Sequence, residues 1–103
     1  MEKMRFFVDT HDKTHKTFPE SLTEAQLAAF WVGYEAACQA EGVVILQASV
    51  GLEAGRAFCM TMAPDAAAVQ RAHDRVGLPF DSITEVKTLS PGALFLQPPT
   101  SSS

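Results

Sequence analysis

An amphipathic helical pattern between strand-like runs is the feature that most constrains how this chain can fold. Apolar residues recur at the i, i+3, i+4 and i+7 spacing of a helix with one buried face. They are Leu27, Phe30, Trp31, Tyr34, Ala37 and Cys38. Thr23 with Gln26, or Ser21 with Glu24, would form a capping box at the start of this helix. Gly42 ends it, because glycine adopts a left-handed cap at little cost.

Four strand-like segments and a second helix complete the pattern. The predicted strands are residues 4–10, 43–50, 56–62 and 81–86. Glycines at both ends of the turn at 51–55 predict a hairpin between the second and third strands. Asp65 caps the helix predicted over 66–76, and Gly77 ends it. The order β-α-β-β-α-β predicts an α+β, ferredoxin-like fold, in which a four-stranded antiparallel sheet carries two helices on one face.

Length and composition favour one small domain. The chain has 103 residues, and 47% of them are hydrophobic, a normal share for a folded core. We predict a single domain over residues 1–96, in which residues 94–96 dock on the body or on a partner subunit. Residues 97–103 contain two prolines and three serines and are expected to form a flexible tail.

The charge distribution argues against nucleic acid and an anionic membrane as partners. The formal net charge is −4 at pH 7, and the eight basic residues are scattered along the chain. No apolar run is long enough to span a bilayer, and no signal-peptide pattern precedes the first strand. We therefore expect a cytoplasmic protein in which Cys38 and Cys59 stay reduced.

The first predicted strand is apolar on both faces. Alternation directs Phe7 to one face and directs Phe6 and Val8 to the other. Two helices can cover only one of these faces, so the other needs a different cover. A second copy of the chain is the simplest cover, and we predict a homodimer packed through sheet faces or edges.

Two of the three histidines fall within the seven residues from Asp9 to His15. Imidazole and carboxylate groups suit divalent transition metals such as nickel, zinc, copper, cobalt and iron, and they suit acid–base chemistry near neutral pH. Strand alternation places Asp9 and His11 on one face, where they could share a metal or the carboxylate could orient the imidazole. Asp12 and His15 follow on a loop. The ordinary alternative is a polar loop at the end of a strand.

His73 and Cys59 are two further candidate ligands. His73 borders the apolar stripe of the second helix, where the alternative is a core histidine with one nitrogen hydrogen-bonded. Cys59 shares a strand face with Ala57 and Thr61. A thiolate within reach of His11 would favour nickel, zinc or copper, whereas the alternative is a buried, inert thiol.

Several short motifs are concentrated in the second half of the chain. They are Gly55-Arg56-Ala57-Phe58-Cys59, Ala63-Pro64-Asp65-Ala66, Ala68-Val69-Gln70-Arg71-Ala72-His73, Gly77-Leu78-Pro79 and Ile83-Thr84-Glu85-Val86. With them the chain resembles, over roughly residues 4–88, a family of small bacterial nickel-binding proteins, formerly a domain of unknown function. The resemblance implies a ferredoxin-like fold, dimerisation and, for at least some members, Ni(II) binding. His73 matches the family's helix histidine, and Cys59 matches its strand cysteine.

Three functions fit these residues. The first is a non-enzymatic metal-binding protein, with nickel as the ion implied by the resemblance, and we favour it. Its candidate ligands are His11, His15, Asp9, Asp12, His73 and Cys59. The second is a small-molecule binder or enzyme, similar to dimeric ferredoxin-like monooxygenases or isomerases, with a cleft lined by Trp31, Tyr34, Met60 and His73. The third is a structural or partner-binding domain with solvated histidines.

Overall fold

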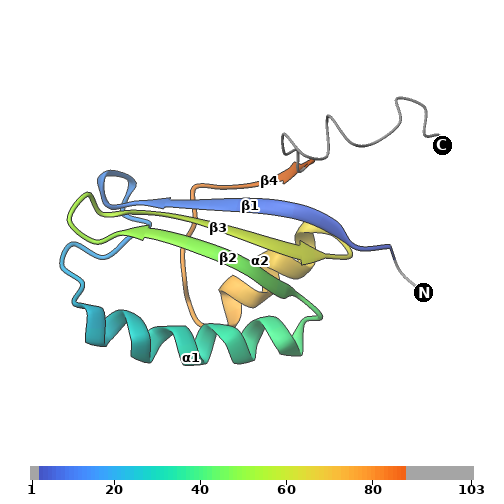
Figure 1. The fold of residues 1–103 in the computed structure, drawn as a ribbon, viewed down its shortest axis with the longest axis horizontal. Helices are drawn as coiled ribbons and strands as arrows, with labels where there is room; N and C mark the ends of the chain where they lie inside the picture. Colours follow the sequence, from blue (N-terminus) through green and yellow to red (C-terminus); the bar gives the residue numbers. More distant parts are fainter. Residues whose placement is uncertain (1–2, 88–103) are drawn as a thin grey trace, which may run out of the picture.

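Residues 3–87, the part of the chain that the computed structural model describes, form a four-stranded antiparallel sheet with two helices on one face (Figure 1). The elements are β1 (Arg5–Asp12), the 3-10 helix η1 (Lys13–His15), α1 (Glu24–Ala40), β2 (Val44–Gly51), β3 (Arg56–Ala63), α2 (Ala66–Arg75) and β4 (Ser82–Val86). The strand order is β2-β3-β1-β4. The predicted β-α-β-β-α-β fold is confirmed, whereas the segments predicted at 94–96 and 97–103 lie outside the described residues. Neither helix of the described part has the length and hydropathy to cross a membrane.

Both helices begin at predicted caps. The Thr23 hydroxyl accepts from the Gln26 N–H at 3.1 Å, and the Gln26 side-chain oxygen accepts from the Thr23 N–H at 3.0 Å. Of the two capping boxes that the sequence allowed, this is the one that forms. Asp65 caps α2 by accepting from the Ala68 N–H at 2.9 Å. Such caps stabilise a helix by about 1 kcal/mol and determine where it begins.

The segment after β1 contains a short element that was not predicted. β1 continues to Asp12, and one turn of 3-10 helix follows over Lys13–His15. The Asp12 side chain caps this turn by accepting from the Thr14 N–H at 2.9 Å, and the Lys13 N–H donates to the Gly55 carbonyl at 2.8 Å. Gly55 has a φ of +70°, and a Cβ there would collide with the Lys13 side chain. The turn therefore depends on the β2–β3 hairpin, a contact that local sequence patterns do not reveal.

One face of the sheet is buried under the helices. As alternation predicted, the buried side chains of β1 are Phe7, Asp9 and His11, and those of β3 include Ala57, Cys59 and Thr61. The helices complete this layer with Tyr34, Cys38, Val69 and Ala72. Asp9 and His11 thus lie in a mainly apolar core, where polar groups need partners.

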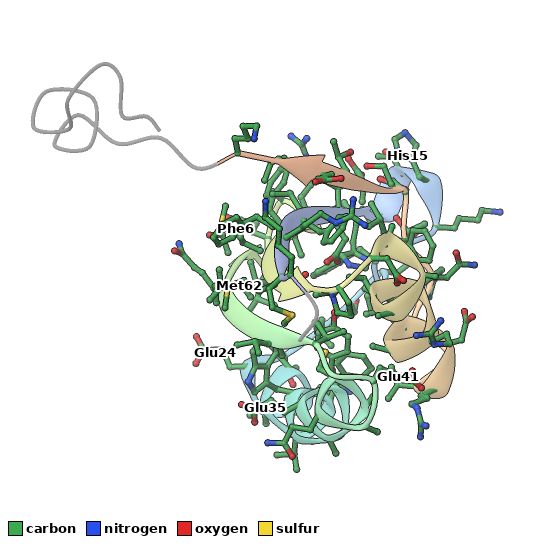
Figure 2. The ribbon with its side chains drawn as sticks, turned by 90° about the vertical axis from the view of Figure 1, so that its right-hand side faces the viewer. Phe6, His15, Glu24, Glu35, Glu41 and Met62 are labelled. Carbon is green, nitrogen blue, oxygen red and sulfur yellow. The ribbon has the colours of Figure 1, made fainter. Side chains whose placement is uncertain are left out.

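No helix within residues 3–87 covers the other face of the sheet. Phe6 of β1 lies opposite Met62 of β3, and Figure 2 shows both on the side of the sheet away from the helices. The large hydrophobic residues exposed on β2 and β3 are Val44 at 46%, Leu46 at 44% and Phe58 at 43%. The prediction that β1 would be apolar on both faces is confirmed.

Candidate metal centre

Side chains from β1 and α2, two elements that are distant in the sequence, meet under α2. Asp9 and His11 come from the buried face of β1, and His73 comes from the last turns of α2. Asp9 and His73 are completely buried, and His11 is 4% exposed. Each of the three offers one ligand atom, and these atoms all lie within 4.8 Å of one another.

The two imidazoles point at the same carboxylate oxygen. His11 Nε2 lies 2.8 Å from Asp9 Oδ2, and His73 Nε2 lies 3.1 Å from the same atom. The two rings stack with their centroids 5.4 Å apart and their planes inclined by 19°. The other carboxylate oxygen, Asp9 Oδ1, is buried and has no hydrogen-bond partner among the described residues.

The remaining ring nitrogens fix the tautomer of each histidine. His11 Nδ1 lies 2.8 Å from the Pro79 carbonyl oxygen and 3.2 Å from that of Thr17. His73 Nδ1 lies 2.8 Å from the Val69 carbonyl oxygen. Since carbonyl oxygens only accept, both Nδ1 atoms carry a hydrogen and donate it. A neutral imidazole in this tautomer directs the lone pair of Nε2 toward Asp9.

This arrangement requires a positive charge between the histidines and the carboxylate. A carboxylate oxygen facing two nitrogen lone pairs would be repulsive, so protons on the Nε2 atoms or a shared cation must lie among the three groups. Burial raises the pKa of Asp9, but hydrogen bonds and charge from His11 and His73 outweigh it and hold this pKa below its usual value. Burial lowers the pKa of His11, but Asp9 outweighs it and raises this pKa. Both shifts favour an ion pair between the Asp9 carboxylate and a protonated His11 ring when no metal is bound.

Aromatic rings surround the centre on its helix side. The Tyr34 and Phe80 rings meet the His73 ring edge-on, with centroids 5.3 and 5.1 Å from it. These rings restrict water around the three polar groups, and electrostatic interactions strengthen where water is excluded.

His15 and Asp12, two other candidate ligands, lie outside this cluster. His15 Nδ1 lies 3.0 Å from Asp81 Oδ2, and the His15 side chain is 64% exposed. Asp12 accepts from the Thr14 N–H and hydroxyl, and its Oδ2 lies 3.3 Å from Arg56 Nε. The structure therefore separates His15 from His11, although only three residues stand between them.

Cys59, the last candidate, lies on the same buried face but not in the cluster. It is directly opposite Asp9 in the β1–β3 register. Burial, followed by the nearby Asp9 carboxylate, raises the pKa of its thiol to about 12, so the sulfur is protonated near neutral pH.

The groups that orient the two histidines leave no residue-type signal in the sequence. They are backbone carbonyls of Pro79, Thr17 and Val69, and any residue type could supply them. The predicted helix did carry one usable signal, because Val69 precedes His73 by four residues, the spacing at which a helical side chain reaches a carbonyl of the preceding turn.

Comparison with known proteins places the chain in a family. The profile of the family described as "Nickel responsive protein SCO4226-like" matches residues 7–86, a range that contains Asp9, His11 and His73. The chain belongs to this family. The membership confirms the resemblance found in the second half of the sequence.

A solved structure of this family is similar to the fold described above. It is SCO4226 from Streptomyces coelicolor A3(2), with 30% sequence identity and a TM-score of 0.69. The alignment covers 82% of this chain and 99% of that protein. Among curated proteins, none matches the chain significantly.

Proposed function

We propose that this protein binds a divalent transition metal ion, nickel being the ion that the family description favours, through Asp9, His11 and His73. The observation that carries the proposal is the orientation of the imidazoles, whose Nδ1 atoms donate to carbonyls while their Nε2 atoms converge on Asp9. Proteins commonly orient histidine ligands by such a hydrogen bond from the second nitrogen.

The donor set suits a borderline metal. Two neutral imidazole nitrogens and one carboxylate are ligands for nickel, zinc, cobalt and iron(II), and they leave further coordination positions for water or other groups. Asp9 Oδ1, which has no hydrogen-bond partner among residues 3–87, is an additional donor oxygen. Cys59 is a soft donor on the same face, but its raised pKa means that it would bind only after a metal helped to remove its proton.

Metal binding at this site competes with a proton. The raised pKa of His11 reflects the imidazolium that Asp9 holds in the metal-free protein. A metal ion would take the place of that proton between the same atoms, so binding should release a proton and weaken as the pH falls. His15 and Asp12 are not part of the proposed site, because each is engaged elsewhere.

Calorimetric titration of the tag-free protein with Ni(II), Zn(II) and Co(II) tests this function. We expect one tight site per chain, and we expect His11→Gln to weaken it by at least about 100-fold, more than loss of an outer hydrogen bond costs. His15→Gln is the matched control, because it makes the same change at an exposed histidine four positions further along the chain. Equal affinity in wild type and His11→Gln would refute the proposal.

A homodimer through the open sheet face is part of the same proposal. Exposed Val44, Leu46 and Phe58 on that face are the residues whose burial would stabilise a pair. Light scattering during size-exclusion chromatography would show two chains, and Phe58→Glu would shift the species toward a monomer. The cytoplasmic location and the lack of nucleic-acid and membrane partners stay predictions from the sequence.

A further inference from the structure

A row of apolar side chains crosses one end of the open sheet face. Directly opposite residues of neighbouring strands share a face, and the register aligns Val44 of β2, Met62 of β3, Phe6 of β1 and Val86 of β4. Val44 is 46% exposed, and the other three are half-buried. Figure 2 shows Phe6 and Met62 together on this face. These four residues, which we call the apolar row, therefore need a cover that the described residues do not supply.

The same face is mostly polar at its other end. Four positions further along β1 from Phe6, the residues aligned across the sheet are Ser49, Phe58, Thr10 and Ser82. Phe58 is the one large apolar side chain among them. A cover for the apolar row therefore has to lie over one end of the sheet rather than over the whole face.

The chain leaves the sheet at this row. β4 ends at Val86, and Figure 1 shows this point at the end of the sheet where β1 begins. In the sequence that follows, Pro91-Gly92 is typical of a turn, and the apolar run of residues 93–96 comes directly after it. The family profile stops at residue 86, so this run is not part of the pattern that the family shares.

We propose that residues 93–96 pack across the apolar row of their own chain. Leu94 follows Val86 by eight positions, and an extended chain of that length spans about 26 Å. Four adjacent strands span only about 14 Å from the first to the last. The segment can therefore reach every strand of the row, even with a turn at Pro91-Gly92.

A second copy of the chain is the competing cover for this end of the face. A segment tethered so close to its target has an effective concentration on the order of millimolar, so it occupies the row before a second copy at about micromolar concentration can. Phe58 lies about 13 Å from Phe6 along the strands and stays free for the homodimer proposed above. The contact involves none of the proposed metal ligands, whose side chains lie on the helix side of the sheet.

Thermal unfolding of the full chain tests this contact. Leu94→Ser/Leu96→Ser removes two side chains that alternation directs to the same side of the segment, and we expect it to lower Tm by about 5 °C or more. Because the contact lies within one chain, the loss should not depend on protein concentration, and light scattering should give the same molecular mass as for wild type.

A double-mutant cycle tests where the segment packs. In a Phe6→Ser background the change at Leu94 and Leu96 should cost less than half as much, because its partner is already missing. Phe58→Ser makes the same change at the other end of the same face, and in that background the cost should equal that in wild type. If Phe6→Ser does not fold, Val44→Ser, at an exposed position of the row, replaces it in the cycle.

Three results would each overturn the proposal. An unchanged Tm in Leu94→Ser/Leu96→Ser would mean that the segment covers nothing. Equal costs in the Phe6→Ser and Phe58→Ser backgrounds would mean that it packs elsewhere, for example along the outer edge of β4. A lower molecular mass in Leu94→Ser/Leu96→Ser would mean that it packs on a second copy of the chain.

Discussion

Histidines contact a carboxylate in two regions of this protein, at nearly the same distances but in different surroundings. His11 and His73 meet Asp9 at 2.8 and 3.1 Å in the core, whereas His15 meets Asp81 at 3.0 Å on the surface. The distances alone would assign all three histidines the same role. Burial separates them, since Asp9 and His73 are inaccessible to solvent while the His15 side chain is 64% exposed.

The second ring nitrogen marks the other difference. In the buried cluster each Nδ1 donates to a backbone carbonyl, which fixes the ring and leaves two Nε2 atoms directed at one oxygen. In the surface pair Nδ1 itself contacts Asp81, which also accepts from the Thr17 hydroxyl at 2.7 Å. Nitrogen lone pairs that are fixed and converge on one point are suited to a metal, whereas the single exposed contact between His15 and Asp81 is a weak surface interaction.

Replacing each carboxylate by its amide tests this comparison most strongly. Asp9→Asn removes the charged ligand shared by both imidazoles, and we expect it to lower nickel affinity by at least about 100-fold. Asp81→Asn makes the same change at the surface pair and should leave nickel affinity within about three-fold of wild type. Calorimetric titration measures both. Comparable losses in the two variants would mean that the surface pair belongs to the metal site.

Two of the three residues in the buried cluster are close together in the sequence, so their shared face could be predicted, whereas the approach of the third could not. Alternation along one strand sufficed to place Asp9 and His11 on the same face. His73 is 64 residues from Asp9 along the chain. Its approach depends on how α2 packs across the sheet, and helical periodicity only showed that it bordered the apolar stripe. His73 can be both a core histidine and a candidate ligand. Its Nδ1 donates to the Val69 carbonyl, as a core histidine would, and its Nε2 faces Asp9.

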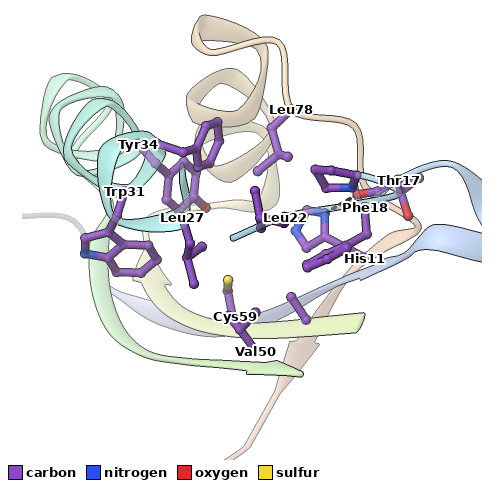
Figure 3. Close-up of a pocket in the computed structure, with 13 residues that line it drawn as sticks. His11, Thr17, Phe18, Leu22, Leu27, Trp31, Tyr34, Val50, Cys59 and Leu78 are labelled. Atoms are coloured by element: carbon purple, nitrogen blue, oxygen red, sulfur yellow. Dashed lines mark hydrogen bonds between the residues drawn. The ribbon is translucent and has the colours of Figure 1, made fainter. Parts of the chain in front are cut away.

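The order of helices and strands was predictable because each element has its own periodicity, cap or turn residues. Two details were not. A bulge interrupts the β2–β3 register between Ile45 and Gln47, and the 3-10 turn over Lys13–His15 depends on Gly55. The cleft predicted for a small-molecule binder is present only in part. Trp31 and Tyr34 line a cavity between α1 and the sheet (Figure 3), but Met60 is not among its lining residues and His73 belongs to the polar cluster.

Thermal unfolding with and without nickel gives the next largest effect. A ligand at 100 times its Kd stabilises the folded state by about 2.7 kcal/mol. For a domain of this size each kcal/mol raises Tm by roughly 4–8 °C, so we expect a rise on the order of 10 °C or more. The rise should persist in His15→Gln and vanish in His11→Gln. A rise that persisted in His11→Gln would place the stabilising metal elsewhere.

The pH dependence of stability should change direction when metal binds. In the metal-free protein, the His11 pKa is raised above 6.5, so its contribution is complete below that pH and is lost as the pH rises through the folded-state pKa. The Asp9 pKa is lowered below 3.8, so its contribution is present above that pH and is lost only in stronger acid. The contribution of His11 in metal-free protein should therefore fall as the pH rises above 6.5, whereas nickel-bound protein should gain stability over the same range, because fewer protons compete with the metal. Urea unfolding on both sides of that pH measures this, with His11→Gln as the control.

The surface pair should give the smallest effect. The hydrogen bond and charge of Asp81 raise the pKa of His15 above 6.5, so this contact stabilises the fold at low pH and is lost as the pH rises through the folded-state pKa. Because His15 is exposed, solvent and salt screen the contact, and its loss should hardly change the unfolding midpoint. An NMR titration of the His15 ring should show a raised pKa in wild type that returns toward 6.5 in Asp81→Asn. A large loss of stability in Asp81→Asn would contradict this expectation. It would show that the Asp81 contacts to His15 and Thr17 hold the loop in place. Because the Thr17 carbonyl of that loop contacts His11, the surface pair would then be linked to the buried cluster.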